Sequence, residues 1–132
     1  MKMILKIDKS NLGYFAGIGV IVLAFLVLLT FNIVGYGAQE RCRIAQERHS
    51  GDCTEALMVY LQDGSNGFRA RNSAVWALGQ LGDARALPLL KSYYVGVPDG
   101  REPLDEAISQ YELKKAIKLL EGGFNMTAWL WR

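Results

Sequence analysis

The chain has 132 residues, of which 15 are Lys or Arg and 13 are Asp or Glu, giving a formal net charge of +2. This length allows one small domain and one further segment. Residues 1–37 hold three of the basic residues and one of the acidic ones, so the rest of the chain carries equal numbers of each. Such a balance excludes the dense basic footprint of a nucleic-acid-binding protein.

The N-terminal part predicts a membrane-spanning helix. Residues 1–11 form a short basic flank with three lysines, and no residue from 10 to 39 is charged. Between Tyr14 and Tyr36 the chain is almost wholly apolar, long enough to cross the roughly 30 Å hydrocarbon core of a bilayer as a helix. A cleaved signal peptide is the alternative, but its apolar core usually has only about 7–15 residues. We predict a transmembrane helix over residues 12–37.

The charges around this span leave its orientation nearly open, because three lysines precede it and three arginines follow it closely. A span so near the N-terminus most often acts as a signal anchor. We therefore expect the following domain on the extracytoplasmic side of the membrane, periplasmic or extracellular. Gly13 and Gly17 are small residues four positions apart, a spacing compatible with a homo-oligomer formed through the transmembrane helix.

The two cysteines lie on either side of a predicted turn. Residues 38–48 can continue the membrane helix outward, and a turn at residues 49–52 leads to an amphipathic helix over residues 53–62. On one continuous helix Cys42 and Cys53 would be roughly 16 Å apart, too far for a bond. Because the turn folds the chain back, we predict a Cys42–Cys53 disulfide, which indicates an oxidising compartment. Two free buried thiols in a cytoplasmic domain are the alternative.

Two further helices are predicted around a short glycine turn. Residues 63–67 are turn formers, and in the helix after them apolar residues recur at spacings of three and four, at Ala70, Ala74, Ala77, Leu78 and Leu81. Gly79 and Gly82 bracket the end of this helix. Asp83 is then the expected N-cap of a second helix over residues 84–94.

These two helices also carry a family resemblance. The stretch from Arg69 to Leu90 reads Arg-x-Arg-x-x-Ala-x-x-Ala-Leu-Gly-x-Leu-Gly-Asp-x-Arg-Ala-Leu-Pro-x-Leu. It resembles a HEAT-type repeat of the short kind named after phycobilisome lyases. The resemblance implies stacked helical pairs that bind other proteins through one row of helices, in a family that spans scaffolds, adaptors and a few enzymes.

The C-terminal part predicts one more helix and a tail. Residues 95–103 are rich in glycine and proline and break the regular pattern. A final amphipathic helix is expected over residues 104–121, with Asp105 and Glu106 in its first turn and an apolar face formed by Ile108, Tyr111, Leu113, Ala116, Ile117, Leu119 and Leu120. The predicted fold class is all-α. One transmembrane helix precedes a short HEAT-like α-solenoid of about five helices over residues 38–123, and an aromatic tail occupies residues 124–132.

Groups that carry chemistry are few. The single histidine, His49, lies with Cys42 and Cys53 in a Cys-x6-His-x3-Cys spacing that fits no common zinc pattern. A Cys–His nucleophile pair would need an orienting group and a pocket, to which nothing else in the sequence points. The glycine-rich loops lack a phosphate-binding arrangement. We predict no catalytic residue, no metal and no cofactor.

The sequence predicts a membrane-anchored protein–protein interaction module that acts as an adaptor, a scaffold or an accessory subunit of a membrane complex. Its expected partner is another protein, itself membrane-associated. The candidate contact residues are those that core packing explains least, namely Arg69, Arg71, Arg85, Tyr94, Tyr111, Trp129 and Trp131. An enzyme-like role resembling the bilin lyases and a transient assembly factor are the alternatives.

Some of these residues also have structural interpretations. Arg69 and Arg71 could pair with loop carbonyls or with Asp83. Trp129 and Trp131 form either an exposed pair that contacts a partner or the membrane, or a docked pair that seals the last helix, which we favour.

Overall fold

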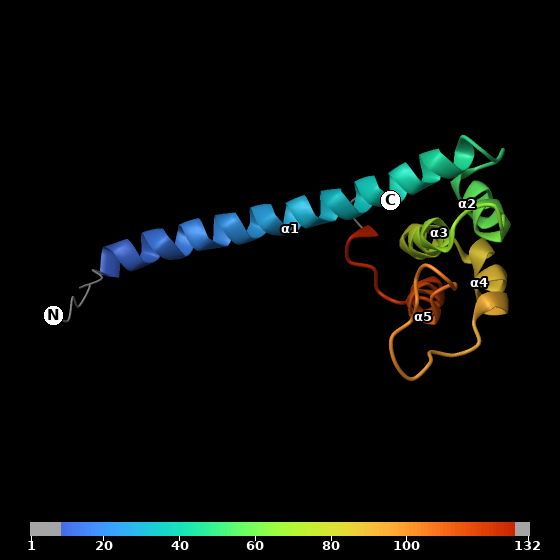
Figure 1. The fold of residues 1–132 in the computed structure, drawn as a ribbon. Coiled ribbons are helices and arrows are strands. Elements are labelled where there is room, and N and C mark those ends of the chain that lie inside the picture. Colours follow the sequence, from blue (N-terminus) through green and yellow to red (C-terminus); the bar gives the residue numbers. More distant parts are fainter. Residues whose placement is uncertain (1–8, 129–132) are drawn as a thin grey trace.

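The computed structural model describes residues 9–128, and within that range it is helical, with no strand. Its elements are α1 (Lys9–Gln46), α2 (Cys53–Gln62), α3 (Phe68–Leu81), the 3₁₀ turn η1 (Ala84–Ala86), α4 (Leu87–Tyr93) and α5 (Gln110–Leu120) (Figure 1). The predicted all-α class is confirmed.

Helix α1 is one continuous helix of 38 residues, about 57 Å long at 1.5 Å per residue. It is long and apolar enough to cross a membrane. Its apolar N-terminal part projects away from the rest of the molecule (Figure 1), whereas Ala38 and Ala45 in its C-terminal part are fully buried against α2 and α3. The expected outward continuation of the apolar helix into the domain is therefore confirmed.

Local signals set the ends of the first two domain helices. The Asp52 carboxylate accepts a hydrogen bond from the Glu55 amide (2.9 Å), and the Glu55 carboxylate accepts one from the Asp52 amide (3.3 Å), a capping box that starts α2. Gly82 ends α3 at φ +66°, a left-handed conformation that glycine adopts at little cost. Asp83 then caps η1 by accepting from the Arg85 amide (3.0 Å). The helix expected at residues 84–94 is thus a 3₁₀ turn followed by a short α-helix.

The four domain helices form two rows. Figure 1 shows α3 and α5 side by side, with α2 and α4 on the side farther from the N-terminal part of α1. Asn72 near the start of α3 contacts Ser109 at the start of α5, and Gly79 near the end of α3 contacts Ala116 farther along α5. The two helices therefore run parallel. At Gly79 an added Cβ would lie 2.8 Å from the Ala116 Cα, so only glycine permits this close approach.

The core lies between these rows. The largest fully buried side chains are Leu57, Leu61, Val75, Leu78, Leu90 and Leu113. They come from α2, α3, α4 and α5, so every domain helix contributes to one continuous core, as stacked repeats require.

The expected start of the last helix at residue 104 is wrong. Residues 103–107 form a separate turn, and α5 begins only after Ser109, whose hydroxyl accepts from the Glu112 amide (3.1 Å). Asp105 and Glu106 are therefore not in its first turn. The prediction that Tyr111 belongs to the apolar face of this helix is also wrong, because Tyr111 is not among the buried residues of α5 and is 55 % exposed.

The chain after α5 is tied back to α3. The side chain of Asn125 donates to the Gln80 side chain (3.0 Å), and Ala128 is buried. Trp129 and Trp131 lie outside the described residues, so the docked tail stays a prediction.

Candidate interaction groove

A groove of about 980 Å³ lies between α1, α3 and the segment that follows α4. The first wall is formed by some of the residues between 33 and 41 of α1, and the second by one face of the first nine residues of α3. Residues 101–106 form the third wall.

The base of the groove is a direct contact between α3 and α1. An added Cβ on Gly37 would lie 3.2 Å from Cη2 of Trp76, so the half-buried indole rests on the backbone of α1. Ile33 and Val34 extend this apolar base toward the N-terminal part of α1. Helix α3 therefore crosses α1 where the uncharged stretch ends.

Asn72 holds the third wall in place. Its Nδ2 donates to the carbonyls of Leu104 (3.1 Å) and Ala107 (3.0 Å), and its Oδ1 accepts from the amide of Ser109 (2.8 Å). Only 8 % of Asn72 is exposed. One buried amide on α3 thus fixes an otherwise irregular segment through three hydrogen bonds.

Glu102 joins the same wall to the start of α5. Its carboxylate accepts from the hydroxyl of Ser109 (2.5 Å) and from the amide of Gln110 (2.6 Å). Burial acts to raise the pKa of Glu102, but the hydrogen bonds from Ser109, Gln110 and Tyr111 outweigh it and hold that pKa below its usual range. The ionised carboxylate also suits the positive end of the helix dipole.

The rim of the groove carries charges of both signs. Arg69 makes a bidentate ion pair with Asp105 (2.8 and 3.0 Å), which lowers the pKa of that carboxyl. Both side chains are mostly exposed, so the pair adds little stability and leaves its charges accessible. Arg41 and Arg101 also line the groove, and neither forms an ion pair with a described residue.

Two of the candidate contact residues have structural partners elsewhere. Arg71 donates to the carbonyl of Leu61 (2.7 Å) and lies over the ring of Phe68. It thus pairs with a backbone carbonyl, but with one at the end of α2 and not with the expected loop carbonyl. The expected pairing of Asp83 with Arg69 or Arg71 is wrong, because Asp83 pairs with Arg85 (2.6 Å). Arg85 also pairs with Asp52 (2.8 Å) and Glu55 (3.3 Å). Hydrogen bonding from Arg85 lowers the pKa of Asp83 to about 2.

Neither of the two tyrosine candidates lines the groove, and Trp129 and Trp131 lie outside the described residues. Tyr94 is half-buried against the core, and Tyr111 is exposed on α5. Of the five candidates that the structure describes, only Arg69 lines the groove. Sequence reasoning missed Asn72, Arg41, Arg101 and Asp105 as groove residues, because their neighbours lie on distant segments and leave no local signal.

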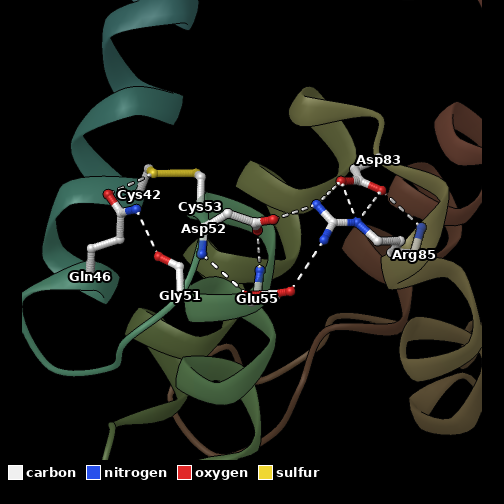
Figure 2. The surroundings of a disulfide bond; sticks show 8 residues. All are labelled: Cys42, Gln46, Gly51, Asp52, Cys53, Glu55, Asp83 and Arg85. Atoms are coloured by element: carbon white, nitrogen blue, oxygen red, sulfur yellow. Dashed lines mark hydrogen bonds and ion pairs between the residues drawn. A yellow bond between two sulfur atoms is a disulfide. The ribbon is translucent and has the colours of Figure 1, made fainter.

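The cysteine pair lies beside the Arg85 ion pairs, where α1 meets α2 (Figure 2). Cys42 and Cys53 are joined in a disulfide, with their Cα atoms 5.1 Å apart. The side-chain amide of Gln46 also donates to the carbonyl of Gly51 (3.2 Å), across the turn. The predicted pairing is confirmed, and it fixes the end of α1 to the first residue of α2.

Within the part of the chain that the structure describes, no group of three or more His, Cys, Asp or Glu residues is placed to hold a metal ion. His49 lies at the turn, with its Nε2 3.8 Å from Oδ2 of Asp63 and its ring edge-on to Tyr60. Among the residues that line the groove, only those of α1 are close to His49 in the sequence.

Part of the chain matches a known family model. Residues 70–96 match the model of the PBS lyase HEAT-like repeat, and they cover most of α3 together with η1 and α4. The resemblance seen in the sequence motif is thereby confirmed. No curated protein and no solved structure matches the chain.

Proposed function

We propose that this chain, which carries a HEAT-like repeat of the PBS lyase type, is a membrane-anchored protein-interaction module. In this proposal α1 is a single-pass anchor, and the partner binds in the groove between α1 and α3. The module acts as an adaptor, a scaffold or an accessory subunit of a membrane complex. The observation that carries the proposal is that one wall of the groove belongs to the HEAT-like repeat and another to the apolar helix itself.

The lining of the groove suits a polypeptide. Trp76 offers an aromatic surface at the base, and aromatic and arginine side chains are enriched where protein interfaces gain most of their energy. Arg41 on α1 and Arg101 on the third wall can bind carboxylates, and Glu106, also on the third wall, can bind a cation. A partner segment with apolar and mixed-charge residues complements this combination.

The position of the groove along α1 supports a membrane-associated partner. Tyr14 to Tyr36 spans about 33 Å as a helix, enough for the hydrocarbon core. Gly37 and Arg41 then lie at the level of the lipid headgroups, and the Ile33 end of the groove borders the acyl chains. A disulfide is rare in a reducing compartment, which supports an extracytoplasmic domain.

The name of the matched repeat keeps an enzyme-like role as the second candidate. The residues that line the groove include arginines and carboxylates but neither histidine nor cysteine. The lining thus lacks thiol and imidazole groups, and two of its carboxylates, Glu102 and Asp105, are already bound to Ser109 and Arg69, which favours binding over catalysis. Stable co-purification with a membrane partner would separate an accessory subunit from a transient assembly factor.

Site-specific photo-crosslinking of the full chain in its native membrane tests the proposal. A benzophenone amino acid at position 106, on the groove wall, is expected to give one discrete protein adduct that survives purification. The same amino acid at position 92, exposed on α4, is expected to give none. Arg41→Glu combined with Arg101→Glu should reduce the adduct at least tenfold while the chain stays in the membrane. Equal labelling from positions 106 and 92 would overturn the proposal. So would an adduct at position 106 whose yield does not change in the Arg41→Glu, Arg101→Glu variant.

A further inference from the structure

The segment after α5 presents two large apolar side chains that no described residue covers. Phe124 is 84 % exposed and Met126 is 61 % exposed. Between and after them, Asn125 and Thr127 are half-buried and Ala128 is buried. The apolar and polar side chains therefore face opposite sides of the same short segment.

Hydrogen bonds hold this segment in place. The amide of Asn125 and the hydroxyl of Thr127 both donate to Oε1 of Gln80, near the end of α3 (3.0 and 3.4 Å). The Thr127 hydroxyl also lies 2.8 Å from Oδ1 of Asn125, which in addition accepts from the amide of Ala128 (3.3 Å). These bonds direct Asn125 and Thr127 toward α3, and among the described residues Phe124 and Met126 are left exposed.

The segment lies on the side of the domain from which α1 would enter the bilayer. Figure 1 shows that the chain after α5 lies closer to the N-terminal part of α1 than α3 and α5 do. Helix α3 itself crosses α1 at Gly37, one residue beyond the apolar stretch that ends at Tyr36. The segment that carries the exposed apolar pair therefore lies on the side of the domain that would face the bilayer.

We propose that Phe124 and Met126 insert into the interface of the bilayer in which α1 is anchored, so that the domain rests on the membrane. This inference depends on the proposed anchoring by α1. Aromatic side chains favour the headgroup level, and a face with apolar residues directed toward the acyl boundary is typical of interfacial segments. Two side chains are too few for a stable protein interface, which buries about 800 Å² on each partner. They suffice for a domain that α1 already holds at the surface.

Seating on the bilayer would fix the direction in which the groove opens. With α1 as one wall and the segment around Phe124 on the membrane, the domain cannot rotate about α1, and the groove stays at headgroup level. A partner embedded in the same bilayer then meets the groove in one orientation, which lowers the entropy lost on binding.

Photo-crosslinking in proteoliposomes of phosphatidylcholine alone tests the inference, because no partner protein is present. A benzophenone amino acid is placed at position 21, 124 or 95 of the full chain. Ile21 is 69 % exposed on α1, and Val95, 87 % exposed, follows α4 on the other side of the domain. We expect lipid adducts from positions 21 and 124, with the yield at position 95 at least tenfold lower.

Each other outcome has a definite meaning. A lipid adduct at position 21 but not at position 124 would overturn the seating and leave the anchoring intact. Absence of lipid adducts at both would overturn the anchoring, and the seating with it. An adduct at position 124 to a second copy of the chain would also overturn the seating, in favour of a homo-oligomer. Equal lipid labelling at positions 124 and 95 would show that the domain has no preferred face.

Discussion

Replacing both Cys42 and Cys53 with serine is expected to lower the free energy of unfolding of the helical domain by about 3 kcal/mol, the value for a loop of this length. The bond closes a loop with a sequence separation of 11 and joins α1 to α2 across the turn. Without it, the C-terminal end of α1 is held to α2 by non-covalent packing, such as that of the buried Ala45, and by the Gln46–Gly51 hydrogen bond. Thermal unfolding of the full chain in mild detergent, followed by circular dichroism, measures the change.

Reduced wild-type protein is the matched control for the double serine variant. Both should melt at the same lowered temperature, since both lack only the covalent bond. If the oxidised wild type, the reduced wild type and the variant all melt together, the disulfide contributes nothing to the fold, and the attachment of the domain to α1 rests on packing alone.

Asn72→Ala is expected to destabilise the domain by a similar amount, about 3 kcal/mol, because it removes three hydrogen bonds and leaves the buried amide of Ser109 without a partner. The loss should be concentrated in residues 101–109, whose backbone Asn72 holds against α3. Hydrogen–deuterium exchange of that segment should therefore rise well before the rest of the domain opens.

Ser73→Ala provides the control on the neighbouring residue of α3. The Ser73 hydroxyl donates only to the carbonyl of Arg69 within the same helix, so its removal should change the stability by less than about 0.5 kcal/mol. If the Asn72 and Ser73 variants behave alike, the segment is held by contacts other than those of Asn72, and the wall of the groove is not fixed as described.

The features that were predicted from the sequence are those whose partners lie nearby in the chain. The start of α2 after the turn at residues 49–52 and the termination of α3 at Gly82 each depend on residues within one helical turn. The Cys42–Cys53 pair is separated by a single short turn, so its geometry followed from the turn formers between the two helices. Local propensity is decisive in such cases.

The features that were missed depend on residues far apart in the chain. Helix α5 starts at Gln110 because Asn72 and Glu102 bind the backbone around Ser109, and neither partner is visible in the periodicity of residues 104–121. The groove combines α1, α3 and the 101–106 segment, so no single stretch of sequence predicts it. Arginines were correctly recognised as outside the core, but burial pattern alone could not separate Arg69 on the rim from Arg71 and Arg85, which bind within the domain.

The most direct test of a membrane-anchored domain outside the cytoplasm is labelling of intact cells with a membrane-impermeant maleimide, with and without prior reduction, followed by recovery of carbonate-washed membranes. The chain should remain in the washed membranes and should be labelled only after reduction, because Cys42 and Cys53 are bonded and the domain is accessible from outside. Labelling that requires cell lysis but no reduction would place the domain in the cytoplasm with free thiols. Recovery of the chain in the soluble fraction would show that α1 is not an anchor.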